Sequence, residues 1–194
     1  MDNDYLKKVL ELASVSNPYE QPTEQDWRKV ELELGIILPD DYKNLLSKIG
    51  NGHFGDLVLL NPVSSAESML FNYENTIGYH QTIRWGDTEI DIPLFPDKSG
   101  FLHIGGTGFN MLLLIEEGKK NNYKICCYEL DVQIGHILDM TLCRFLYDMY
   151  NGLIREKWAL ECREIIWFVE GKIGPFFTSR PGIINTGRID LLNG

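Results

Sequence analysis

Apolar residues in the first fifty positions recur at intervals of three and four, the spacing of one helix face. This pattern predicts helices over residues 4–14, 24–34 and 41–49. Gly35 and Gly50 directly follow the second and third helices, at the position where glycine is favoured at helix C-termini. The N-terminal quarter of the chain is therefore predicted to be helical, with a proline-containing loop after the first helix.

Capping residues support the starts of the second and third helices. Thr23 precedes the second helix, and the acids that follow it lie in the first turn, where the helix dipole favours negative charge. Asp40 or Asp41 is expected to cap the third helix. An acid also falls on the apolar face of the second helix, where Glu31 follows Trp27 at a spacing of four.

The middle of the chain changes to the alternation and short apolar runs that are typical of strands. Strands are predicted over residues 57–60, 87–94, 101–104, 111–115 and 123–130. Residues 65–85 are predicted to be mostly helical. Residues 117–122, rich in Gly, Lys and Asn, are predicted to form a hairpin loop between the last two strands.

Helical spacing returns after the strands. Thr141 is expected to cap a helix over residues 141–153, and apolar residues continue at helical spacing as far as Val169. The order of helices, then strands, then helices predicts an α+β fold with a mostly antiparallel sheet. Residues 1–155 are expected to form one α+β domain, and residues 156–194 a C-terminal helical extension and tail packed on it.

The chain carries a formal net charge of −10, and the acids lie mainly before residue 141. This charge disfavours nucleic-acid binding, which requires a basic face, and it favours a basic protein partner. It also fits a merely soluble acidic surface. No apolar run approaches the length of a membrane span, and the start of the chain lacks a signal-peptide pattern, so a cytoplasmic location is expected.

The cysteines and histidines form no recognisable site in the sequence. The four cysteines lack the spacing of a zinc site or a disulfide framework, which predicts buried thiols in a reducing compartment. The histidines show no metal-ligand spacing, so neither a metal nor a cofactor is expected. A nucleophilic pair of Cys143 with His103 or His136 has no support in the sequence, which does not place these residues in space. No enzymatic activity is expected.

Two glycine-rich strings resemble nucleotide-binding motifs. Residues 50–55 match G-x-G-x-x-G, but they follow a predicted helix and precede a predicted strand, the reverse of a dinucleotide site. Residues 105–108 lack the Lys-Ser/Thr pair of a phosphate loop. Both strings are interpreted as turns.

Acidic residues alternate with other residues over the first five positions of the predicted strand 87–94. Asp87, Glu89 and Asp91 therefore share one strand face. Such a row fits the Lys and Arg side chains of a partner, and it equally fits a solvated edge whose charges prevent aggregation. The candidate partner-binding residues are this row together with Asp56 and Trp85.

The N-terminal motif resembles the signature of the SUKH superfamily. The family pattern is a helix with a Glu and Leu-Gly, then Leu-Pro, then a helix with Tyr and Leu-Leu that ends in a Gly-Asn-Gly turn. The residues that match it as fold determinants are Trp27, Leu34, Gly35, Pro39, Tyr42, Gly50, Asn51 and Gly52.

Weaker similarity continues to about residue 155, through residues 92–95 and 101–108 and the Phe145-Leu146 pair. The family usually carries an acid beside its central glycine, whereas this chain has Gly106 and Thr107 there, which puts any role of that acid in doubt. The chain also continues about 40 residues past the closing helix.

The resemblance implies a protein that binds a partner protein and catalyses no reaction. Bacterial members of the superfamily are similar to cytoplasmic antidotes that block secreted toxins, often nucleases, and fungal members regulate cell-wall synthesis. An acidic inhibitor suits a basic nuclease cleft. The expected function is therefore a toxin-binding immunity protein, and the alternative is an adaptor for cell-wall synthesis or signalling proteins. Trp85, Tyr73 and Tyr79 are either interface anchors or core residues.

Overall fold

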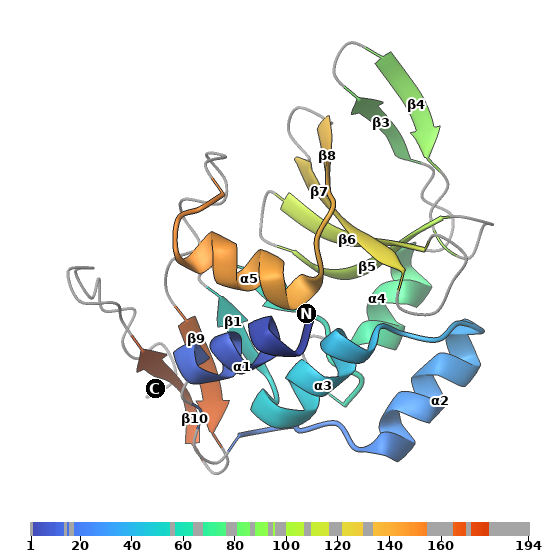
Figure 1. The fold of residues 1–194 in the computed structure, drawn as a ribbon. Helices are drawn as coiled ribbons and strands as arrows, with labels where there is room; N and C mark the ends of the chain where they lie inside the picture. The colour runs from blue at the N-terminus through green and yellow to red at the C-terminus, as the bar shows by residue number, and fades with distance from the viewer. Residues whose placement is uncertain are drawn as a thin grey trace.

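The computed structural model describes residues 2–13, 15, 18–54, 57–63, 68–76, 81–85, 88–92, 95, 100–106, 110–116, 122–129, 134–154, 165–169 and 172–178. The described part of the chain is an α+β fold built on one ten-stranded sheet (Figure 1). The predicted fold class is therefore confirmed.

Three helices lie at the start of the chain and two lie among the strands. They are α1 (Asp2–Ala13), α2 (Glu24–Leu34), α3 (Asp40–Ile49), α4 (Met69–Thr76) and α5 (Leu142–Tyr150). The predicted N-terminal helices and the helix after Thr141 are confirmed. None of the helices in the described ranges is long and apolar enough to cross a membrane.

Of the first two predicted helix caps, one is confirmed and the other is wrong. Thr23 caps α2 as expected, and a capping box with Asp26 is complete, with the Thr23 amide donating to Asp26 Oδ2 at 2.8 Å. By contrast, the N-cap of α3 is Pro39, and no side chain caps it. Asp40 and Asp41 instead occupy the first helical turn, so the prediction that one of them caps α3 is wrong.

The strands are all short. They are β1 (Gly52–Phe54), β2 (Leu57–Leu59), β3 (Gln81–Trp85), β4 (Thr88–Ile92), β5 (Phe101–Gly106), β6 (Asn110–Glu116), β7 (Tyr123–Glu129), β8 (Ile134–Leu138), β9 (Ile165–Val169) and β10 (Lys172–Thr178). Their order across the sheet is β10-β9-β1-β2-β5-β6-β7-β8-β3-β4. Every pairing is antiparallel except the single parallel contact between β3 and β8.

The C-terminal extension differs from its prediction. Residues 165–169 form strand β9, which pairs with β1, and residues 172–178 form β10, which pairs with β9. The helical spacing expected as far as Val169 is therefore wrong over β9, because β-branched and aromatic residues dominate this stretch and β1 offers it a pairing edge. The expected helix over residues 65–85 is present over Met69–Thr76 and is wrong over Gln81–Trp85, which form β3.

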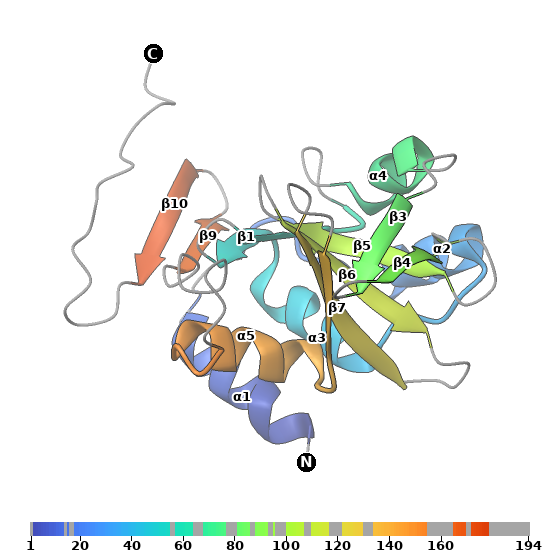
Figure 2. The ribbon, with the colours of Figure 1, turned by 90° about the horizontal axis from the view of Figure 1, so that it is seen from above.

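The main hydrophobic core lies between the sheet and the N- and C-terminal helices. Helix α1 packs against α5 and α3, and α3 also contacts α5. Figure 2 shows α1 and α5 on one side of the sheet and α4 on the other. The core joins these helices to β5 and β7 through side chains that include Leu46, Ile104, Ile125 and Phe145. Burial of this apolar surface is the main favourable term in the folding of such a domain.

Candidate functional site

The residues of the N-terminal motif gather at the corner between α2 and α3. The ring of Trp27 meets the ring of Tyr42 edge to face, with centroids 5.6 Å apart, and both side chains are buried. Trp27 Nε1 donates to Ser47 Oγ at 2.7 Å, and the Tyr42 hydroxyl donates to the carbonyl of Leu60. Burial raises the pKa of Tyr42 well above its ordinary value, so the phenol remains a neutral donor. The aromatic pair therefore ties α2 to α3 and β2.

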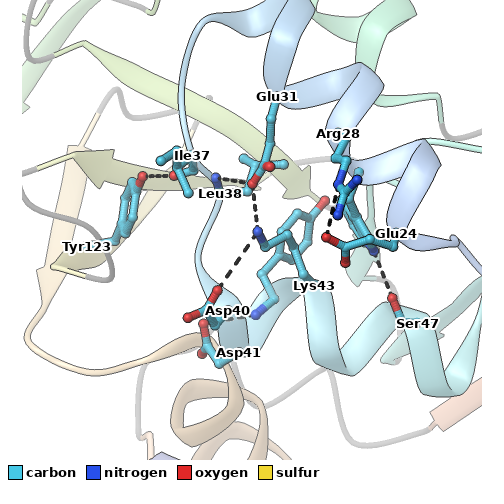
Figure 3. A network of polar contacts seen from close by, with 12 residues as sticks. Glu24, Arg28, Glu31, Ile37, Leu38, Asp40, Asp41, Lys43, Ser47 and Tyr123 are labelled. Carbon is cyan, nitrogen blue, oxygen red and sulfur yellow. Dashed lines mark hydrogen bonds and ion pairs between the residues drawn. The ribbon is translucent and has the colours of Figure 1, made fainter.

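Glu31 is the polar centre of the same corner (Figure 3). Its Oε1 accepts from the Leu38 amide at 2.9 Å and from Lys43 Nζ at 2.7 Å, and Lys43 Nζ also lies 3.8 Å from Asp40 Oδ1. The side chains of Lys43 and Glu31 are only 20% and 18% exposed. A charged pair with this much burial requires both partners, because an unpaired charge there would be costly. Glu31 thus fixes the loop that joins α2 to α3.

Two motif glycines occupy backbone conformations that side chains rarely adopt. Gly35 has φ 69° and ψ 21°, and its amide donates to the Glu31 carbonyl at 2.9 Å, which ends α2. Gly50 has φ 68° and ψ −146°, and a Cβ there would lie 2.1 Å from the Tyr19 carbonyl oxygen. The Gly50 position therefore requires glycine for both conformation and space.

The remaining motif residues lie around the same corner. Leu34 and Pro39 are buried at the end of α2 and the start of α3. Gly52 begins β1, and the amide of Asn51 donates to the Tyr19 carbonyl at 2.8 Å. The Asn51 side chain donates to Glu20 Oε2 at 3.1 Å. The motif thus joins α2, α3, β1 and the loop before α2, and we call this set of contacts the α2–α3 corner.

Asp41 connects the corner to α5. Its Oδ2 accepts the amide of Cys143, in the first turn of α5, at 3.3 Å. Thr141 is the N-cap residue of α5, but its side chain makes no capping hydrogen bond. The predicted position of Thr141 as the cap of this helix is therefore confirmed, but a carboxylate from α3 accepts the hydrogen bond at the α5 N-terminus.

The candidate nucleophile Cys143 and its two candidate histidines, His103 and His136, lie on three different elements, α5, β5 and β8. Cys143 is buried at the start of α5 within the helix-side core. His103 pairs in register with Leu113, which pairs with Cys126, so His103 and Cys126 share one cross-strand row. They stand two strands apart, about 10 Å by ordinary sheet spacing. The backbone of β6 lies between them.

Burial also holds both groups of that row in their neutral forms. It raises the pKa of the Cys126 thiol to about 12, against a smaller lowering contribution from the backbone of His136. It lowers the pKa of His103 to about 4, and a backbone contact with Gly105 opposes this only in part. A neutral thiol and a neutral imidazole are the reverse of the thiolate–imidazolium pair of a reactive cysteine.

Metal-ligating side chains do not converge in the described part of the chain. No group of three or more His, Cys, Asp or Glu residues lies there in an arrangement that could hold an ion. His136 lies on β8, paired in register with Cys127. Cys126, Cys127 and Cys143 are buried.

The expected partner-binding residues lie partly in the terminal hairpin of the sheet. Trp85 ends β3 and pairs with Thr88, while Glu89 and Asp91 lie at alternate positions of β4. Figure 1 shows this hairpin projecting beyond the other strands. Asp87 and Asp56, and the anchor candidate Tyr79, lie outside the described residues.

The other aromatic candidate belongs to the interior. Tyr73 of α4 is half-buried and packs against Phe95, with ring centroids 5.6 Å apart and tilted. The core interpretation of Tyr73 therefore fits the structure better than an interface role.

Two polar contributors to the corner were not predicted from the sequence. Lys43 is the partner of Glu31, and the signal for such a partner is an acid on an otherwise apolar helix face. Asn61 is fully buried, donates to the Glu20 carbonyl at 3.0 Å and accepts from the Val63 amide at 2.9 Å. The Asn-Pro pair at the end of β2 signals a turn, but nothing in the sequence shows that its amide reaches Glu20.

Fold and corner together define a mostly antiparallel α+β domain whose motif residues join α2, α3 and β1. The model of the SMI1/KNR4 family (SUKH-1) matches residues 21–152 of this chain. The match covers more than half of the sequence, so the chain belongs to this family and to the SUKH superfamily. No curated protein sequence matches the chain significantly.

Proposed function

We propose that this chain is an immunity protein that binds and neutralises a cognate bacterial toxin, such as a nuclease, in the cytoplasm. The observation that carries the proposal is the SUKH-1 family match over residues 21–152, because the superfamily includes toxin antidotes. The protein acts by protein–protein interaction and catalyses no reaction. Its most conspicuous motif is consistent with this, since the described motif side chains are engaged in holding the α2–α3 corner together.

Charge supports a basic toxin domain as the partner. The net charge of −10 creates a field that attracts a basic protein and accelerates its association. A nuclease presents such a basic surface, because it must bind phosphates. We assign the contacts to Glu89, Asp91 and Trp85 of the terminal hairpin, together with Asp87 and Asp56.

The proposal is tested with the toxin domain encoded beside the gene for this chain. Co-expression of the full chain is expected to restore growth of cells that produce this toxin, and the two purified proteins are expected to form a complex. Glu89→Lys/Asp91→Lys should slow association several-fold. The matched control is Glu33→Lys/Asp139→Lys, which changes the net charge equally at exposed positions on α2 and after β8. No rescue and no complex would refute the proposal.

The alternative function is an adaptor that binds cell-wall synthesis or signalling proteins. The matching family model is named for SMI1 and KNR4 as well as for SUKH-1, so an adaptor function is also consistent with the match. The adaptor alternative predicts stable complexes with several unrelated proteins and no protection against the adjacent toxin. An immunity protein instead binds one toxin selectively.

A further inference from the structure

The two edges of the sheet differ in how well they accept another strand. At one edge, β10 contains Pro175, and its register with β9 shifts between Lys172 and Pro175. A proline and a bulge are devices that prevent further pairing at an edge. At the other edge, Thr88–Ile92 of β4 contains no proline and forms five consecutive pairs with β3 without a shift. Only the β4 edge is regular.

The main chain of β4 is paired on one side. All its register partners belong to β3, and β4 is the last strand of the sheet in the described part of the chain. In an antiparallel pair, the N–H and C=O groups of alternate residues point away from the neighbouring strand. These groups form a template for an additional strand. The hairpin that carries them projects from the rest of the sheet (Figure 1).

We infer that β4 is the docking edge of this protein, and that the segment it accepts is an extended stretch of the partner with Lys or Arg at alternate positions. This inference rests on the proposed function, because it takes the toxin as the source of that segment. The partner segment joins the sheet beside β4 through main-chain hydrogen bonds. Its basic residues lie opposite Glu89 and Asp91, which share one face of the strand.

Charge argues against a second copy of this chain as the occupant. Antiparallel pairing of two β4 strands about Ile90 would set Glu89 of each copy opposite Asp91 of the other. Like charges directly opposite each other destabilise a strand pair. Within the hairpin, Glu89 is paired with Arg84, whereas Asp91 is paired with the neutral Thr82. Asp91 is therefore expected to contribute more than Glu89 to the recognition of a basic segment.

The test uses synthetic peptides and the full-length chain labelled with ¹⁵N. The probe is the capped hexapeptide Thr-Lys-Val-Lys-Val-Thr, and its isomer Thr-Lys-Lys-Val-Val-Thr has the same charge without the alternation. The alternating peptide is expected to slow amide hydrogen exchange within residues 88–92, and the isomer is expected to bind several-fold more weakly. Equal binding of both peptides, or changes confined to other parts of the chain, would overturn the inference.

Two N-methylated peptides separate strand addition from simple charge attraction. Methyl groups on the two Lys amides, or on the two Val amides, block opposite edges of the peptide strand. Strand addition predicts that one of these peptides loses binding and the other retains it. If methylation affects both equally, the peptide does not add as a strand.

Variants of the protein complete the test. Glu89→Gln/Asp91→Asn is expected to bind the alternating peptide roughly fivefold more weakly, since each opposite-charge pair across strands contributes a fraction of 1 kcal/mol. Asp91→Asn alone should account for most of that loss, and Glu33→Gln/Asp139→Asn should leave binding unchanged. If the protein binds the adjacent toxin but the amides of β4 are not protected from hydrogen exchange, strand docking is wrong and the proposed function is unaffected. A chain that binds the peptide but not the toxin disproves the proposed function only.

Discussion

His103 lies in β5 between two residues of the main core, and both of its ring nitrogens are buried without a hydrogen bond of regular geometry. Its pKa is lowered to about 4 by burial, whereas an exposed histidine in the unfolded chain titrates near 6.5. Between these two values the unfolded chain binds the proton and the folded chain does not. The free energy of unfolding is therefore expected to fall as the pH decreases from 6.5 to 4, by up to about 3 kcal/mol.

Urea denaturation between pH 4.5 and 7.5 measures this effect, and His103→Leu is expected to flatten the dependence. Leu102→Val, at a buried position of the same strand without a titratable group, is the control and should keep the wild-type slope. Hydrogen bonds from Thr23 lower the pKa of the Asp26 carboxyl below 3.8. That interaction is therefore lost at a lower pH than the range in which His103 affects stability. An unchanged slope in His103→Leu would show that another group governs acid stability.

At the scale of the elements, the ion pair of Glu31 and Lys43 holds the connection between α2 and α3. Lys43→Ala leaves the half-buried Glu31 carboxylate with only the Leu38 amide, at 2.9 Å. We expect this variant to lose about 2 kcal/mol of stability, because a partly buried charge then lacks its partner. Thermal and chemical unfolding measure the loss.

The matched control for that variant is Arg28→Ala on α2, the helix that carries Glu31. It removes the pair of Arg28 with Glu24, whose nitrogen and oxygen lie 3.3 Å apart on an exposed surface. Surface pairs of this kind contribute only about 0.3–0.5 kcal/mol. Equal losses in both variants would mean that burial does not strengthen the Glu31–Lys43 pair.

Local signals explain which elements were predictable from the sequence. The spacing of apolar residues, the capping box at Thr23 and the glycines at positions 35 and 50 act within a few residues, so α1, α2 and α3 could be located. The strand runs of β5, β6 and β7 carry enough apolar residues to be recognised. Strand β1 has one large apolar residue in three, and Gly135 and His136 interrupt the apolar residues of β8, so the neighbours of these strands in the sheet define them.

Long-range contacts explain what the sequence could not predict. The spacing of Ile165, Ile166 and Val169 suits a helix as well as a strand, and the pairing of β9 with β1 decides for a strand. Likewise, the α5 N-terminus meets Asp41, which lies 102 residues earlier than Cys143. The motif residues were recognised by resemblance, but their partners Lys43 and Asn61 appear only in the folded arrangement.

At the scale of the whole molecule, β9 and β10 lie beyond the boundary that the sequence predicts near residue 155, and they belong to the same sheet as the strands before it. Strand β9 lies between β10 and β1, so it extends the sheet of the family domain. It also contacts α1. A chain that ends at residue 155 would leave one edge of β1 without its partner, beside the buried side chain of Phe54. Such an exposed edge invites association with other chains.

We therefore expect the chain that ends at residue 155 to unfold about 5–10 °C below the full chain, since it loses roughly 2–4 kcal/mol of main-chain hydrogen bonding. It should also form oligomers in light-scattering measurements, because the β1 edge becomes available for intermolecular pairing. A chain that ends at residue 178 retains β9 and β10 and is the matched control; it should unfold with the full chain and remain in the same oligomeric state. If the chain that ends at residue 155 had the same melting temperature and oligomeric size as the two longer chains, β9 and β10 would contribute nothing to the stability of the sheet. Residues 21–152 would then carry the fold without them.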